Sequence, residues 1–175
     1  MNFSEQAAYP HRTAIGFGSN LGDSQAILEA ALKTLASSPG LQLQVASPCY
    51  RTLAVGPPQP DYYNLCAQFA TDLTPQALLN TLLAVEAQFG RIRRERWGPR
   101  LLDLDLLLFE DWVVDQPNLQ IPHPRMRERA FVLVPLSDIA PDWLDPVSGQ
   151  SIAQLRSQID CFGVTLVHQP VQPPG

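Results

Sequence analysis

Lysine is nearly absent from this chain of 175 residues, in which Lys33 is the one lysine. Basic residues number 12 in all, against 17 acidic ones, which gives a net charge of −5 and a sequence pI of about 5.0. An acidic balance of this kind argues against a protein whose main task is to coat nucleic acid or an anionic membrane surface. We therefore expect neither nucleic acid nor membrane among its partners.

The chain also lacks a long apolar run. No segment approaches the ~20 consecutive apolar residues that a membrane-spanning helix needs. The N-terminus has no basic stretch followed by an apolar segment, as a secretory signal would. Cysteine is sparse as well, because Cys49, Cys66 and Cys161 are odd in number and have no metal-ligand spacing. These absences predict a cytoplasmic protein with reduced thiols.

Two common nucleotide-binding loops are missing. No Gly-x-x-x-x-Gly-Lys-Ser/Thr sequence occurs, and Gly16-Phe17-Gly18 continues as Ser19-Asn20-Leu21, which fails the spacing of Gly-x-Gly-x-x-Gly. The sequence therefore disfavours both a P-loop and a Rossmann nucleotide-binding enzyme.

The length fits one domain that can bury its own core. We assign residues 1–12 to a polar N-terminal lead, 13–160 to a single domain, and 161–175 to a tail rich in proline and glutamine. Such a terminal segment is expected to fray.

Apolar periodicity predicts a regular order of elements within this domain. Short buried or half-buried strands are expected at 13–17, 41–45 (with a continuation through 50–52), 62–70 and 104–109, and helices at 23–37 and 74–89. A hairpin is expected between 104–109 and 112–114, and a last helix over 126–139 that Pro135 breaks. The order β-α-β-β-α-β predicts an α+β fold, a ferredoxin-like α/β sandwich with an antiparallel sheet, helices packed on it, and additional C-terminal elements.

Arginines are concentrated in one short segment. Residues 91–100 contain five arginines and one acid, Glu95, in a protein that is acidic overall. The planar guanidinium group suits phosphate oxygens. A solvated basic loop explains the arginines alone equally well. The neighbouring Trp97-Gly98-Pro99 favours an anion site instead.

A pair of aspartates follows this segment. Alternation along a strand places Asp103 and Asp105 on one face, with Leu104 and Leu106 toward the core. A lone Asp-x-Asp is more often a turn or cap. A carboxylate within an apolar strand, however, needs a partner, and Mg²⁺ accepts such oxygen ligands. Carboxylates that hold Mg²⁺ beside arginines supply the charge neutralisation that phosphoryl transfer needs.

His123 lies between two prolines, Pro122 and Pro124. A histidine held in this way is either a turn residue or, near a phosphate site, a donor to an oxygen. The residues alone do not decide between these two interpretations.

Residues 96–107, Arg-Trp-Gly-Pro-Arg-Leu-Leu-Asp-Leu-Asp-Leu-Leu, resemble the signature of the 6-hydroxymethyl-7,8-dihydropterin pyrophosphokinase family. The resemblance extends over about residues 13–145. Further matching segments are Gly18-Ser19-Asn20-Leu21-Gly22, Tyr50-Arg51-Thr52, Gly56-Pro57, Asp61-Tyr62-Tyr63-Asn64, Glu86, Gly90-Arg91-Ile92-Arg93, Pro122-His123 and Arg129-Ala130-Phe131.

The resemblance implies an ATP- and Mg-dependent diphosphokinase of folate biosynthesis. It would transfer a pyrophosphoryl group from ATP to the hydroxymethyl group of 6-hydroxymethyl-7,8-dihydropterin and release AMP, and we expect it to act as a monomer. Two Mg²⁺ ions are implied on Asp103 and Asp105. The catalytic set would add Arg91, Arg93, Trp97 and Arg100, and ATP would be bound by Arg91, Arg93, Arg100, Leu106, His123 and Arg129.

The same resemblance implies a pterin site. Tyr62 and Phe131 would sandwich the flat heterocycle, as suits aromatic stacking. Thr52, Val55 and Asn64 would read its polar edge, and Trp97 would belong to a loop that closes over both substrates.

Two other functions remain compatible with parts of the pattern. A non-catalytic ferredoxin-like module could bind RNA, although the acidic balance and the missing sheet aromatics weigh against it. A two-metal phosphodiesterase could use Asp103 and Asp105, but such sites usually need more carboxylate or histidine ligands than the sequence offers nearby.

Asp105→Asn is expected to abolish turnover of ATP with the pterin alcohol and to affect folding only modestly. The substitution removes charge that would hold a metal while it keeps the shape of the side chain. Steady-state turnover and a urea unfolding curve would be measured together. Near-normal turnover would refute the metal role.

Overall fold

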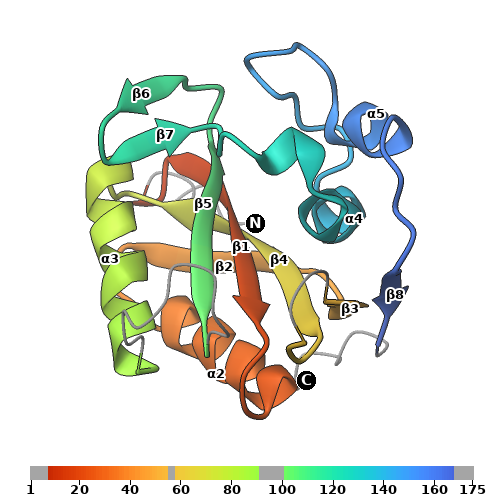
Figure 1. Ribbon diagram of the computed structural model, residues 1–175. Helices are drawn as coiled ribbons and strands as arrows, with labels where there is room; N and C mark the ends of the chain where they lie inside the picture. The colour runs from red at the N-terminus through yellow and green to blue at the C-terminus, as the bar shows by residue number, and fades with distance from the viewer. Residues whose placement is uncertain (1–7, 55–57, 91–100, 168–175) are drawn as a thin grey trace.

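The computed structural model describes residues 8–54, 58–90 and 101–167. An antiparallel sheet forms its centre (Figure 1). Along the sheet the strands follow the order β5 (Asp103–Phe109), β1 (His11–Ser19), β4 (Tyr62–Thr71), β3 (Tyr50–Thr52) and β8 (Val164–Leu166), and β2 (Leu41–Ala46) also pairs with β4. Each of these pairings is antiparallel, which confirms the predicted α+β sandwich.

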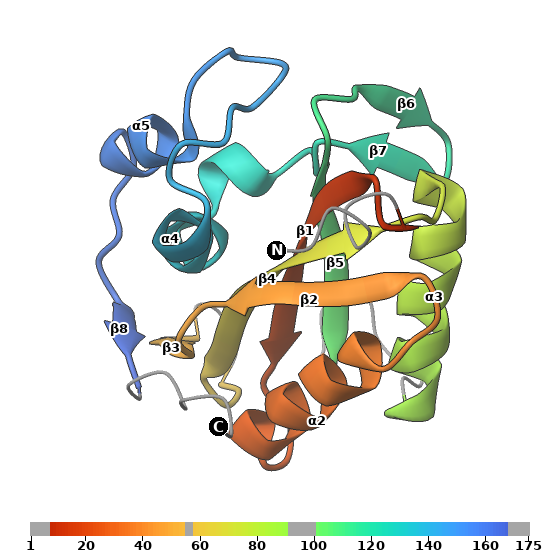
Figure 2. The same cartoon turned by 180° about the vertical axis from the view of Figure 1, so that it is seen from behind.

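Two helices cover one face of the sheet (Figure 2). The first, α2 (Ser24–Ala36), begins where the side chain of Asp23 accepts from the Ala26 N–H. The second, α3 (Pro75–Gln88), begins where Thr74 accepts from the Ala77 N–H. Both caps satisfy backbone donors that the first turn of a helix leaves open. Proline directly after Thr74 suits the first helical position, as the sequence predicted.

The opposite face carries the C-terminal elements. A short 3₁₀ helix η1 (Met126–Glu128) leads into α4 (Ala130–Ile139), and α5 (Ile152–Ser157) packs against α4. Between β5 and η1 the chain forms a separate hairpin of β6 (Val114–Gln116) and β7 (Leu119–Ile121). The sheet is therefore covered on both faces.

The core consists of two clusters of buried residues, one on each side of the sheet. The cluster under α2 and α3 contains Phe17, Phe69 and Phe109. The cluster under α4 contains Cys66 and Leu107. Burial of these apolar side chains is the main favourable term in the stability of the domain.

The predicted hairpin between 104–109 and 112–114 is wrong. Glu110 adopts a positive φ of 49°, and its carboxylate accepts from the Arg12 N–H at 2.9 Å. The chain leaves the sheet there, and Val114 instead pairs with Ile121 across the turn at 117–118. The residues after β5 therefore form β6 of a second, small sheet.

The prediction that Pro135 breaks the last helix is also wrong, since Pro135 lies inside α4. A proline there removes one backbone hydrogen bond. Burial of Leu133, Val134 and Leu136 around it offsets that loss. The helical stretch is interrupted instead at Arg129, whose backbone is extended.

Several boundaries differ from those expected. β1 starts at His11, inside the segment assigned to the N-terminal lead, and β8 lies inside the segment assigned to the tail. The strand expected to continue through 50–52 is split into β2 and β3, because Ser47 uses its hydroxyl to accept from the Cys66 N–H and Pro48 has no N–H. In the part of the chain that the structure describes, none of the helices has both the length and the apolar character needed to span a bilayer.

Leu82→Ala is expected to lower the free energy of unfolding by about 2–5 kcal/mol, because Leu82 is fully buried and its removal leaves a cavity. Leu83, its neighbour on α3, is 46% exposed and serves as the matched control. Leu83→Ala should change the free energy of unfolding by only about 0.5 kcal/mol. Equal losses in urea unfolding curves would contradict the assigned packing of α3.

Candidate active site

A cavity of about 720 Å³ lies against the sheet between α3 and α4. Its lining comes from four strands, two helices and the loops between them, which are distant in sequence. The residues are Gly16, Phe17, Gly18, Thr52, Leu53, Gln59, Tyr62, Asn64, Leu65, Cys66, Leu79, Leu83, Glu86, Asp103, Leu104, Asp105, His123, Arg129, Phe131 and Val132.

Two glycines of β1 form the centre of the cavity floor. Gly18 pairs with Asp103 on one side and with Asn64 on the other. Gly16 pairs in the same way with Asp105 and Cys66. Residues two apart along a strand share a face, so both rows point to the same side of the sheet. Without side chains at their centre, the rows leave open space between the carboxylates of β5 and the polar groups of β4.

Gly18 leaves room for the Asn64 side chain. A Cβ atom on Gly18 would lie 2.8 Å from the Asn64 Nδ2 atom, closer than real Cβ contacts come. A Cβ on Gly16 would meet the Leu107 side chain at 3.4 Å, an ordinary contact. Any side chain at position 18 therefore displaces Asn64.

The aspartates take the positions that alternation predicts. Asp103 and Asp105 line the cavity, while Leu104 and Leu106 are buried in the core cluster beneath α2 and α3. Among the residues that the structure describes, no group of three or more histidine, cysteine or acidic side chains could hold a metal ion. Two carboxylates nevertheless fit Mg²⁺, which commonly binds through one or two carboxylates and completes its octahedral shell with water and substrate phosphates.

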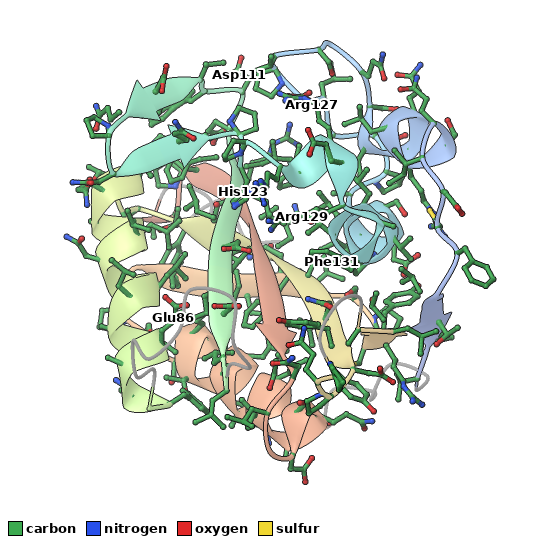
Figure 3. All side chains as sticks on the ribbon, in the orientation of Figure 1. Glu86, Asp111, His123, Arg127, Arg129 and Phe131 are labelled. Atoms are coloured by element: carbon green, nitrogen blue, oxygen red, sulfur yellow. The ribbon has the colours of Figure 1, made fainter. Side chains whose placement is uncertain are left out.

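Glu86 joins this end of the cavity from α3 (Figure 3). It is only 3% exposed, and its Oε2 atom accepts from the Leu104 N–H at 3.2 Å. This hydrogen bond fixes the backbone of β5 at Leu104, the residue between the two aspartates. Sequence reasoning gave Glu86 no role, although an acid on the apolar face of a helix was a signal that could have found it.

His123 and Arg129 line the cavity between β5 and α4 (Figure 3). The His123 Nε2 atom lies 4.0 Å from Asp105 Oδ1, and Nδ1 accepts from the Arg125 N–H at 3.2 Å. The proton of the neutral ring is therefore on Nε2, toward the aspartate. Burial lowers the pKa of His123 below its usual value; Asp105 opposes that shift, and Arg129 and Arg125 reinforce it.

The other end of the cavity is aromatic and polar. Tyr62 and Phe131 line it together with Thr52 and Asn64. Asn64 donates from Nδ2 to the Phe17 carbonyl at 3.4 Å. Its Oδ1 atom and the Thr52 Oγ1 atom are buried and have no hydrogen-bond partner within the described ranges. Buried polar atoms normally have a partner, so these two atoms are available to pair with a polar ligand.

The segment after β3 is tied to its surroundings at several points. The carboxylate of Asp61 accepts from Arg51 Nη2 at 2.6 Å and from the Ala54 N–H at 3.2 Å. Asn20, directly after β1, donates to Gln59 Oε1 at 3.1 Å. These bonds hold Asp61 and Gln59 in place, and Gln59 lines the cavity.

The structure brings most of the sequence-predicted residues together. Eight of them line one cavity: Thr52, Tyr62, Asn64, Asp103, Asp105, His123, Arg129 and Phe131. Leu106 does not line it, because its side chain is buried in the core beneath α2 and α3. Val55, Arg91, Arg93, Trp97 and Arg100 lie outside the described residues.

Cys66 is a cavity residue that the sequence did not suggest. Its thiol is 1% exposed and approaches the Val132 carbonyl at 3.6 Å. Burial raises the pKa of this thiol, and Asp105 adds to the shift. Only the β1–β4 register reveals its position, so no sequence pattern could have found it.

Comparison with known proteins agrees with this geometry. The sequence pattern of 7,8-dihydro-6-hydroxymethylpterin-pyrophosphokinase (HPPK) matches residues 14–141. A Synechocystis protein named 2-amino-4-hydroxy-6-hydroxymethyldihydropteridine pyrophosphokinase is 51% identical over 88% of this chain and 79% of its own length. A Methylorubrum extorquens protein of the same name is 41% identical over 89% of this chain and 98% of its own length.

Solved structures share the fold at low sequence identity. The Plasmodium falciparum HPPK-DHPS triple mutant superposes with a TM-score of 0.69 over 85% of this chain, at 16% identity. The wild-type protein with pteroate gives a TM-score of 0.70 at 13% identity. This chain covers 44% and 42% of those two longer chains. The solved structures show the shared fold, and the matches in sequence establish that the chain belongs to the 7,8-dihydro-6-hydroxymethylpterin-pyrophosphokinase family.

Proposed function

We propose that the cavity between α3 and α4 is the active site in which this chain transfers a pyrophosphoryl group from ATP to 6-hydroxymethyl-7,8-dihydropterin, the reaction of its family in folate biosynthesis. The observation that carries the proposal is the division of one cavity into two ends. One end has two strand carboxylates, and the other has aromatic rings beside two buried polar atoms without partners.

The aromatic end suits the pterin. Tyr62 and Phe131 offer faces for a flat heterocycle, and stacking of this kind contributes about 0.5–1.5 kcal/mol beyond burial of the rings. The Asn64 Oδ1 and Thr52 Oγ1 atoms can accept from ring N–H and amino groups. A ligand that pairs both atoms would gain the hydrogen bonds that the protein itself leaves unmade. Val55 stays a predicted contact.

The carboxylate end suits the triphosphate. We propose that Asp103 and Asp105 hold Mg²⁺, whose role when bound is to neutralise phosphate charge. His123 presents its Nε2–H on this side, and Arg129 lies at the same wall. Arg91, Arg93 and Arg100 are proposed to add positive charge, as the sequence analysis predicts. Leu106 stays a proposed nucleotide contact, which its backbone would have to make because its side chain is buried.

Catalysis in such a site consists mainly of orientation. The hydroxymethyl oxygen attacks the β-phosphorus and gives up its proton, a new O–P bond forms, and the bond from the β-phosphorus to the bridging oxygen breaks, so that this oxygen leaves with AMP. Gly18 pairs with Asn64 on one side and with Asp103 on the other, which supports the proposal that the two substrates meet above it. Trp97 is proposed to help exclude water. We also propose that the chain works as a cytoplasmic monomer.

The direct test is incubation of the protein with Mg-ATP and 6-hydroxymethyl-7,8-dihydropterin, with the products separated by chromatography. We expect AMP and a diphosphorylated pterin in equal amounts, and no turnover once Mg²⁺ is chelated. ADP in place of AMP would indicate ordinary kinase chemistry. The absence of either product at high enzyme concentration would sink the proposal.

Gly18→Ala is expected to weaken pterin binding by about tenfold or more, because the new methyl group displaces the Asn64 amide. The affinity for the pterin would be measured by quenching of intrinsic fluorescence. The same substitution in an Asn64→Ala background is the matched control and should change the affinity little further. Equal losses in both backgrounds would show that Gly18 does not act through Asn64.

A further inference from the structure

Asp145 is a buried charge outside the cavity. Its side chain is fully buried, and it accepts from Arg127 through both Nε and Nη2. It also accepts from the Val147 N–H at 3.1 Å, the Ser148 N–H at 3.3 Å and the Ser148 hydroxyl at 2.7 Å. Burial acts to raise the pKa of Asp145, but these hydrogen bonds outweigh it and hold the pKa below its usual value. Asp145 is therefore a carboxylate at neutral pH.

Its partner, Arg127, lies on η1 between two residues of the cavity. The Met126 N–H donates to the His123 carbonyl at 3.1 Å, and the Arg129 N–H donates to the Met126 carbonyl at 3.4 Å. One residue before η1, the Arg125 N–H donates to His123 Nδ1 at 3.2 Å. Arg127 does not line the cavity, and Figure 3 shows it above His123 and Arg129. The position of η1 thus determines the orientation of the His123 ring and the position of the Arg129 backbone.

The loop that carries Asp145 is itself well held. The Asp145 N–H donates to the Gln150 carbonyl at 2.8 Å, and the Gly149 N–H donates to the Asp145 carbonyl at 2.8 Å. The Ile152 N–H donates to the Trp143 carbonyl at 2.9 Å, and the Ile152 side chain is fully buried. This loop can therefore serve as a fixed support for η1. It lies beyond residue 141, where the family match ends.

We propose that Asp145, acting through Arg127, is a positioning residue that holds η1 so that His123 and Arg129 face the phosphate end of the cavity. The inference rests on the proposed function, since it assigns His123 and Arg129 to the nucleotide. A bidentate arginine–carboxylate pair fixes orientation as well as distance, which a purely apolar contact would not do. Small displacements of positioned groups can reduce rates by up to about 10²-fold.

The test compares Arg127→Met and Asp145→Asn with the wild-type protein. We expect kcat/KM for ATP to fall about 10- to 100-fold, while the dissociation constant for the pterin stays within about twofold. Ser148→Ala removes one hydrogen bond to the carboxylate and should give a smaller loss of the same kind. Asp142→Asn, an exposed aspartate near the same loop, is the matched control and should match the wild-type protein.

The ring nitrogens of His123 give a second readout that does not depend on turnover. In the wild-type protein, ¹⁵N NMR should show the tautomer with the proton on Nε2, and Arg127→Met should shift the Nδ1 signal as its hydrogen bond weakens. The signals can be assigned by their loss in His123→Ala. Should Asp145→Asn not fold, Arg127→Met and Ser148→Ala carry the comparison.

The outcomes separate the two proposals. A wild-type protein that forms no AMP refutes the proposed function, and the His123 signals then still decide whether Arg127 positions the ring. Lower thermal stability with unchanged nucleotide kinetics and unchanged His123 signals would overturn the positioning role and leave a structural ion pair. Equal losses for ATP and for the pterin would overturn it too, because they would indicate general disturbance of the cavity.

Discussion

The pairing of β1 with β5 and β4 is the constraint on which the described site depends. Because side chains alternate along a strand, a slip of one residue would turn Asp103 and Asp105 toward the core beneath α2 and α3 and move Leu104 out of that core. The register shift between Ala14 and Ile15 allows β5 to serve two purposes. Before the shift, β5 presents the carboxylates of Asp103 and Asp105 to the cavity. At and after the shift, Leu107 and Leu108 both pack under α4. The packing of Leu107 and Leu108 thus helps to fix the register of β5, and the register decides which way Asp103 and Asp105 point.

The cavity also shows a conflict between stability and function. A buried polar atom that stays without a partner destabilises a fold by about 1–3 kcal/mol, and a ligand that pairs with the Asn64 Oδ1 and Thr52 Oγ1 atoms would remove this penalty. Gly18 adds backbone freedom in the middle of a strand, which is unfavourable as well. A ligand that pairs with the two polar atoms removes the first cost. It also occupies the space that the missing side chain of Gly18 leaves open. A buried cluster covers each face of the sheet, and this burial stabilises the strands that carry Gly18 and Asn64.

The sequence predicted features that depend only on neighbouring residues, such as the alternation of side chains along a strand and the start of a helix. Alternation placed Asp103 and Asp105 on one face, and Thr74-Pro75 marked the start of α3. Features that depend on distant contacts were missed or wrong. The chain leaves the sheet at Glu110, whose carboxylate accepts from the N–H of Arg12, a residue distant in sequence. The helix α4 continues through Pro135 because the residues around the proline are buried. The approach of His123 to Asp105 likewise depends on the route of the chain from β7 to η1, which no periodicity reveals.

The C-terminal segment belongs to the same physical unit as the rest of the domain. β8 pairs with β3 at one edge of the sheet, and Tyr50 of β3 donates from its hydroxyl to Asp138 of α4. Burial and this hydrogen bond raise the pKa of Tyr50 to about 12, so it stays a donor at neutral pH. The helix is thereby fixed to the sheet at its C-terminal end, while η1 is fixed through Arg127 at the other. Because α4 is the wall that carries Phe131, the geometry of the cavity depends on residues well beyond those that line it.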